Sequence, residues 1–83
     1  MDAALALADL PTPEADRALT QALDDRDALV RHCAARALLA IHGVTVDARA
    51  THCMVYRIMA SETGRREAGR SEIAAALRGR PLA

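Results

Sequence analysis

The stretch from Asp27 to Gly43 carries the pattern that most constrains the fold of this chain. Its apolar residues recur every three or four positions, which is the spacing of one face of an α-helix and not of a strand. They are Val30, Ala34, Ala37, Leu38 and Ile41. Asp27 is a favoured helix N-cap, and Gly43 is the residue type that most often follows the end of a helix. The pattern predicts a helix over residues 28–42 with Leu38 at the centre of its buried face and Leu39 less important.

The apolar fraction of the chain consists largely of alanine. Hydrophobic residues make up 52% of the 83 positions, but 20 of them are Ala and only 21 are large, with neither Phe nor Trp. Alanine favours helix while burying little surface. We therefore expect one domain in which strong local helices surround a thin core.

Four further helices are predicted from the same spacing and from the turn residues between them. They cover residues 2–10, 13 to about 23, 48–60 and 65–78. Pro11 ends the first, Thr12 and Asp47 are placed to cap the second and the fourth of the five helices, and Gly69 weakens the prediction for the last. The apolar faces of the last two comprise Met54, Val55, Ile58 and Met59, and Ile73, Ala76 and Leu77. Because the connections are short, successive helices should be antiparallel neighbours.

Residues 18–41 contain small and charged residues in a recognisable order. The residues concerned are Ala18-Leu19, Ala22-Leu23-Asp24-Asp25, Val30-Arg31, Ala34-Ala35 and Ala37-Leu38. This order resembles a HEAT-type repeat, particularly the short bacterial form found in relatives of phycobilisome lyases. The resemblance covers one full repeat, 12–43, with 2–10 as half of a preceding repeat and 47–79 as a degenerate helix pair. It implies a single all-α domain over 1–83, a short α-solenoid of antiparallel HEAT-like helix pairs with about five helices.

The same resemblance implies polar roles for Asp25 in the turn and Arg31 early in the following helix. In the family these residues tie the turn to its own or to a neighbouring repeat. A carboxylate beside a helix start has free backbone donors nearby, and arginine can reach across a repeat boundary with several donors. The alternative is that both are solvated charges that contribute little to stability.

Two His-Cys pairs, His32-Cys33 and His52-Cys53, are the candidate metal ligands of the chain. The residues around the first pair resemble the helix starts of deoxyhypusine hydroxylase, a HEAT-repeat di-iron enzyme that uses His-Glu dipeptides. Cysteine in place of glutamate removes the carboxylate ligands of such a site. A zinc site is the alternative, but adjacent residues on a helix point about 100° apart and seldom bind one ion together. We therefore expect no metal and two small, buried cysteines.

Charge is balanced overall but divided between the halves of the chain. Residues 1–48 carry eight acidic residues and four arginines, a net of −4, and residues 49–83 carry seven arginines and three acidic residues, a net of +4. A net charge of zero argues against binding to nucleic acid or membranes through bulk charge. Arg65, Arg66 and Arg70 are possible anion contacts, so Arg-mediated nucleic-acid binding is one alternative function, although no aromatic residues accompany them for base stacking. A metal-dependent enzyme relative that has lost its ligands is the other alternative.

The sequence contains no recognisable enzyme motif. It has neither a glycine-rich phosphate loop nor a plausible Ser-His-acid set. It also lacks an apolar run near the roughly 18 residues of a membrane helix and a basic N-terminal signal region. We therefore predict a cytoplasmic protein-interaction module that is not an enzyme and needs no cofactor.

The three leucines Leu5, Leu7 and Leu10 are the predicted interaction residues. Leu5 and Leu7 lie roughly 200° apart around a helix, so two opposite faces of residues 2–10 are apolar. One face can pack on the next helix, but the half repeat lacks the helix that would cover the other. An exposed leucine costs about 1.5–3 kcal/mol, so we expect another protein or a second copy of the chain to cover that face.

Overall fold

A computed structural model describes residues 11–44 and 48–82, and these residues form helices and turns without a strand. The helices are α2 (Pro13–Ala22), α3 (Ala28–Ile41), α4 (Ala48–Ile58) and α5 (Thr63–Leu77). The predicted all-α class is therefore confirmed. The helix predicted at residues 2–10, with its leucines, and the predicted cap Asp47 lie outside the described residues. None of the described helices is long and apolar enough to cross a membrane.

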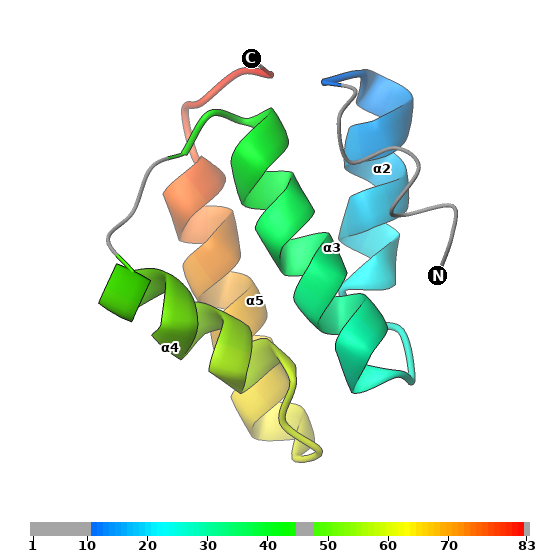
Figure 1. The fold of residues 1–83 in the computed structure, drawn as a ribbon, viewed down its shortest axis with the longest axis vertical. Coiled ribbons are helices and arrows are strands. Elements are labelled where there is room, and N and C mark those ends of the chain that lie inside the picture. The colour runs from blue at the N-terminus through cyan, green and yellow to red at the C-terminus, as the bar shows by residue number, and fades with distance from the viewer. Residues whose placement is uncertain (1–10, 45–47, 83) are drawn as a thin grey trace.

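Helix α3 lies at the centre of the fold, with α2 on one side and α4 and α5 on the other (Figure 1). Among the described helices, α2 packs against α3 only, whereas α4 and α5 pack mainly against each other and also contact α3. This arrangement buries eight of the 14 residues of α3. Leu39 is one of them and is only 4% exposed. Leu39, predicted to matter less than Leu38, therefore also belongs to the core, because α3 has neighbours on both sides and buries more than one stripe.

Local side chains determine where α2 and α3 begin, as the sequence predicts. The hydroxyl of Thr12 accepts a hydrogen bond from the amide of Ala15 at 3.1 Å, and Pro13 occupies the first helical position. The carboxylate of Asp27 accepts the amide of Leu29 at 2.8 Å. Each cap satisfies a backbone donor that the first turn of a helix leaves free, so each helix begins at the residue after its cap.

Gly43 determines where α3 ends. Its φ of 65° is a left-handed conformation that glycine adopts without steric cost. The amide of Gly43 donates to the carbonyl of Ala40 at 3.0 Å, and the amide of Val44 donates to the carbonyl of Leu39 at 2.9 Å. This pair of bonds is a Schellman motif, and Val44 packs back against the core. The predicted termination at Gly43 is confirmed.

Helices α4 and α5 approach each other closely at Gly69. A Cβ atom at this position would lie 2.9 Å from the amide nitrogen of Ile58 and 3.1 Å from the Cβ of Arg57. Arg57 also forms an ion pair with Glu72 across the same two helices. The glycine that weakens α5 by its low helix propensity is thus required for close packing between the helices.

Each described helix contributes one of the largest fully buried side chains, namely Leu19, Leu38, Ile58 and Ile73. Met54 and Val55 are also buried, as predicted. Met59 was predicted to face inward but is 36% exposed, because α4 ends at Ile58 and the chain turns there. The last helix begins at Thr63, two residues earlier than predicted. The core therefore depends on a few large apolar residues, one each from α2 and α5, three from α4 and four from α3.

His42 connects three segments at the end of α3. Its Nε2 lies 2.6 Å from a carboxylate oxygen of Asp16 in α2, and its Nδ1 lies 3.0 Å from the carbonyl oxygen of Arg80 beyond α5. Both partners are acceptors, so only the doubly protonated ring can donate to both. Burial lowers the pKa of His42, but the hydrogen bonds to Asp16 and Arg80 and the negative charge of Asp16 outweigh this effect, and the pKa is raised above 6.5.

Replacing either Leu38 or Leu39 with alanine should destabilise the fold strongly. The two side chains are 1% and 4% exposed, so each substitution leaves a cavity that typically costs about 2–5 kcal/mol. Leu29 on the same helix is 51% exposed, and Leu29→Ala should cost less than about 1 kcal/mol. Urea titrations followed by circular dichroism measure the three free energies of unfolding. A Leu39→Ala variant as stable as Leu29→Ala would contradict the central position of α3.

The stability of the fold should fall as the pH rises through the pKa of His42. Because the folded pKa lies above 6.5, the contribution of the charged ring is complete below pH 6.5 and is lost as the pH passes the folded value. Thermal melts between about pH 5 and about pH 9 span this titration. Over the same pH range, the melting temperature of His42→Gln should fall less than that of the wild type, because the variant has no ring that loses a proton. Parallel profiles for the two proteins would show that the ring gains no proton affinity on folding.

Candidate functional site

Arg31 is a charged side chain in the interior, with only 4% of its surface exposed. Its side chain extends from the first turn of α3 to the end of α4. Its Nε donates to the carbonyl of Ile58 at 2.7 Å, and its Nη2 donates to the carbonyls of Met59 at 3.1 Å and Ala60 at 3.4 Å. Carbonyl groups at the end of a helix lack hydrogen-bond donors within that helix. Arg31, on the neighbouring helix α3, donates hydrogen bonds to those at the end of α4.

The remaining nitrogen of Arg31 binds the turn between α2 and α3. Its Nη1 donates to the backbone carbonyls of Asp25 at 2.6 Å and Arg26 at 3.0 Å. The carboxylate of Asp25 instead accepts the amide of Asp27 at 2.9 Å, which closes the turn. Asp25 and Arg31 therefore act on the same turn through its backbone, and Arg31 joins that turn to the end of α4.

The two histidines of the His-Cys pairs border one groove, whereas the cysteines do not. His32 on α3 and His52 on α4 both line a groove of about 470 Å³ between these helices, named here the α3–α4 groove. Cys33 is half-buried and Cys53 is exposed, so the prediction of two buried cysteines is wrong, because neighbouring positions on a helix face different surroundings. In residues 11–44 and 48–82, no group of three or more His, Cys, Asp or Glu side chains is placed to hold a metal ion.

The three arginines predicted as anion contacts all have partners within the chain. Arg70 forms an ion pair with Asp24. Arg66 donates to two backbone carbonyls of the preceding turn, at 2.9 and 3.2 Å. Arg65 lies 3.6 Å from Glu62, and its side chain is 60% exposed. Two of these contacts stabilise the start of α5, and the Arg70 pair joins α5 to the end of α2.

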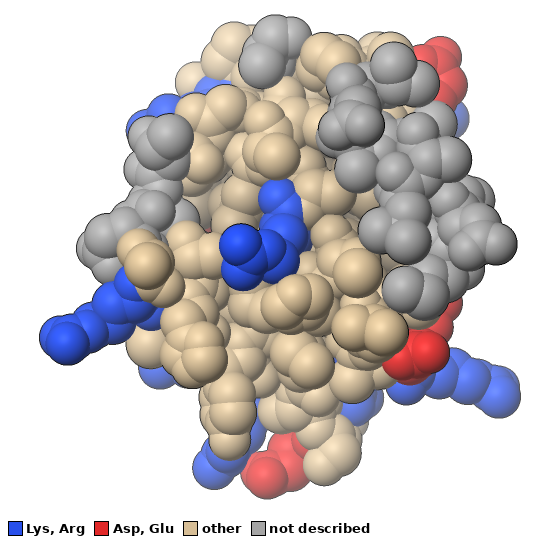
Figure 2. Space-filling view, viewed as in Figure 1, with Lys and Arg blue, Asp and Glu red and all other residues tan. Residues whose placement is uncertain are grey.

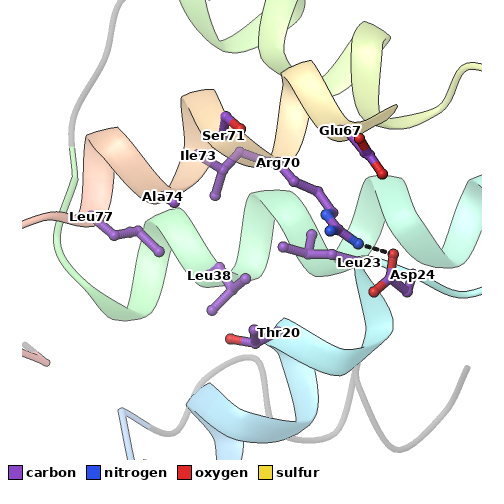
Figure 3. A pocket seen from close by; sticks show the side chains of 10 residues that line it. All are labelled: Thr20, Leu23, Asp24, Leu38, Glu67, Arg70, Ser71, Ile73, Ala74 and Leu77. Carbon is purple, nitrogen blue, oxygen red and sulfur yellow. Dashed lines mark hydrogen bonds and ion pairs between the residues drawn. The ribbon is translucent and has the colours of Figure 1, made fainter. Parts of the chain in front are cut away.

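A second groove, of about 610 Å³, lies between the end of α2, the middle of α3 and α5, and is named here the α2–α5 groove (Figure 3). Its apolar lining residues are Leu23, Leu38, Ile73, Ala74 and Leu77. The ion pair between Asp24 and Arg70 lies at one end, near Glu67, while Leu77 lies toward the other end (Figure 3). This groove therefore combines an apolar floor with a charged end.

The sequence alone does not predict the α2–α5 groove. Asp24 and Arg70 are 46 positions apart, and nothing in their local surroundings indicates that they meet. The one available signal is the helical spacing of Arg70, Ala74 and Leu77, which places them along one side of α5. That spacing defines a face but not the helices it packs against.

Comparison with known proteins does not assign the site. No protein-family model, no curated protein and no solved structure matches this chain. The resemblance to HEAT repeats therefore rests on the sequence of the α2–α3 pair. Since Leu5, Leu7 and Leu10 lie outside the described residues, the two grooves are the surfaces from which a function can be argued.

Asp25 and Arg31 should be energetically coupled through the turn that both of them hold. Arg31→Ala removes five hydrogen bonds to carbonyl groups and should cost about 3–5 kcal/mol, as for a broken buried charge network. Asp25→Ala removes one exposed hydrogen bond and should cost about 1 kcal/mol. The double variant should lose less free energy of unfolding than the sum of the two single losses. Once one substitution has loosened the turn, the other removes fewer stabilising interactions. A double-mutant cycle in urea measures the coupling, and strict additivity would show that the two residues act independently.

Proposed function

We propose that this chain is a protein-interaction module that receives an apolar side chain of another protein in the α2–α5 groove. The observation that carries this proposal is the apolar floor with an ion pair at one end of the same groove (Figure 3). Its volume of about 610 Å³ lies in the range of grooves that accept ligand groups. Burial of an apolar anchor supplies affinity at such surfaces, and polar groups at the rim fix its orientation.

The two ends of the groove offer different contacts. Ala74 is exposed and Leu77 is half-buried, so an inserted side chain of leucine size removes apolar surface of both partners from water. Such burial contributes about 1.5–3 kcal/mol. At the charged end, the side chain of Asp24 is 68% exposed and keeps acceptor capacity beyond its pairing with Arg70. The partner segment should therefore carry an apolar anchor next to a hydrogen-bond donor.

We further propose that the module consists of two HEAT-like helix pairs, α2–α3 and α4–α5. The extensive packing within each pair supports this proposal, and so does Arg31, which connects one pair to the other. A regular HEAT stack would also bring the first helices of the two pairs together. In the described part of the chain α2 contacts neither α4 nor α5, so the helix packing between the pairs runs through α3 and the stack is splayed. We place the module in the cytoplasm, a location consistent with the free thiols of Cys33 and Cys53.

A matched pair of substitutions on α5 tests the groove. Ala74 lines the groove and Ala75 does not, although both residues are exposed. Peptides selected from a displayed library on the wild-type protein are titrated against wild type, Ala74→Arg and Ala75→Arg by fluorescence anisotropy. Ala74→Arg should weaken binding at least about tenfold, because the new side chain occupies the groove, and Ala75→Arg should change it less than about twofold.

The same three proteins separate the possible outcomes. A library that yields no binding peptide, or equal loss of affinity in both variants, would contradict the proposal. Sedimentation velocity determines whether the partner is a second copy of the chain. A dimer that is lost in Ala74→Arg and kept in Ala75→Arg identifies self-association through the groove.

A further inference from the structure

The α3–α4 groove differs in chemistry from the α2–α5 groove. Its polar lining comes from His32 and Arg36 on α3 and from Thr51, His52 and Tyr56 on α4. None of the lining residues within 11–44 and 48–82 is acidic, although the chain has eleven acidic residues and eleven arginines. All five polar side chains can donate a hydrogen bond. A groove of about 470 Å³ with donors and without carboxylates is suited to an organic anion.

Arg36 provides the charge for such an anion. It is exposed, and it forms no ion pair or hydrogen bond with the residues that the structure describes. Arg57 and Arg70, in contrast, are each paired with a carboxylate. In Figure 2 one group of arginine atoms lies near the middle of the face shown, and other arginines and the coloured carboxylates lie toward its edges. An unpaired guanidinium presents a planar set of donors that matches the oxygens of a phosphate group.

His32 provides a buried polar atom without a partner. Its Nδ1 is shielded from solvent and has no hydrogen-bond partner among the described residues. Because Nδ1 is shielded from solvent, a group bound in the groove would meet the other ring nitrogen, Nε2. Either ring nitrogen of histidine can carry the proton, so His32 can act as a donor to an anion.

One wall of the groove is aromatic and apolar. The rings of His52 and Tyr56 lie on successive turns of α4, with centroids 6.2 Å apart and planes inclined by 31°. Tyr56 is 62% exposed and Met59, which also lines the groove, is 36% exposed. Exposed flat and polarizable side chains beside a cationic group favour a ligand that carries a planar ring.

We propose that the α3–α4 groove binds an aryl phosphate monoester. Its phosphate contacts Arg36, His32 and Thr51, and its ring packs on His52 and Tyr56. Three different donors from two helices fit a phosphate, which offers three free oxygens, better than a carboxylate, which offers two. A free aryl phosphate and a phosphotyrosine side chain share this chemistry. The site is independent of the proposed protein-binding groove, because the two share no lining residue.

Titrations of ¹⁵N-labelled full-length protein with phenyl phosphate test the site. Parallel titrations with inorganic phosphate and with phenol test the two halves of this ligand separately. Amide shifts should saturate at residues around the α3–α4 groove, and phenyl phosphate should bind at least about tenfold more tightly than either half. Arg36→Gln should weaken this binding at least about tenfold. Arg49→Gln is the control, since Arg49 is exposed on α4, does not line the groove and carries the same charge; its effect should be less than about twofold.

Each outcome has a defined meaning. Absence of saturable shifts, shifts confined to other surfaces, or equal losses in Arg36→Gln and Arg49→Gln would overturn the proposal. Because Arg36 is exposed, Arg36→Gln should keep the wild-type melting temperature, so weaker binding reports on the site and not on folding. A peptide with phosphotyrosine then distinguishes the sources. Tighter binding than phenyl phosphate identifies a protein side chain, and equal or weaker binding identifies a free aryl phosphate.

Discussion

The guanidinium group of Arg31 is the interaction on which the rest of the structure depends. It is buried, and its described partners are five carbonyl oxygens, two from the α2–α3 turn and three from the end of α4. A buried charge is very costly unless its donors are satisfied, so both segments are held where they can reach it. Displacing either segment would leave donors unpaired, which couples the α2–α3 pair to the α4–α5 pair. In a chain with few large apolar residues, this polar contact carries much of the geometry between the pairs.

The thin core follows from the abundance of small side chains. Helix α3 buries Ala34, Ala35 and Ala37, and α5 approaches α4 at Gly69, so the helix backbones can lie close together at their points of contact. The two grooves are lined mainly by larger side chains, among them Leu38 and Leu77 in the α2–α5 groove and His52 and Tyr56 in the α3–α4 groove.

The opposite charges of the two halves of the chain meet within one molecule. Arg70 of the basic half pairs with Asp24 of the acidic half, and the end of the chain at Arg80 is joined to Asp16 through His42. These contacts close the structure around α3 and place a charged end on the α2–α5 groove. Arg36 takes no part in them, and its charge remains available to the α3–α4 groove. The pairing of Asp24 with Arg70 thus gives the α2–α5 groove its charged end, and the exposed Arg36 borders the other groove.

The sequence by itself determined where α2 begins and where α3 begins and ends. Thr12, Asp27 and Gly43 act on backbone groups within four residues of themselves, so their effects do not depend on the rest of the fold. The tertiary structure decided which faces are covered and which residues form the grooves. Leu39 is buried because α3 has neighbours on both sides, and Arg31 binds Ile58, 27 positions away. Such contacts depend on how the helices dock, and docking is the sum of many weak interactions that no local pattern records.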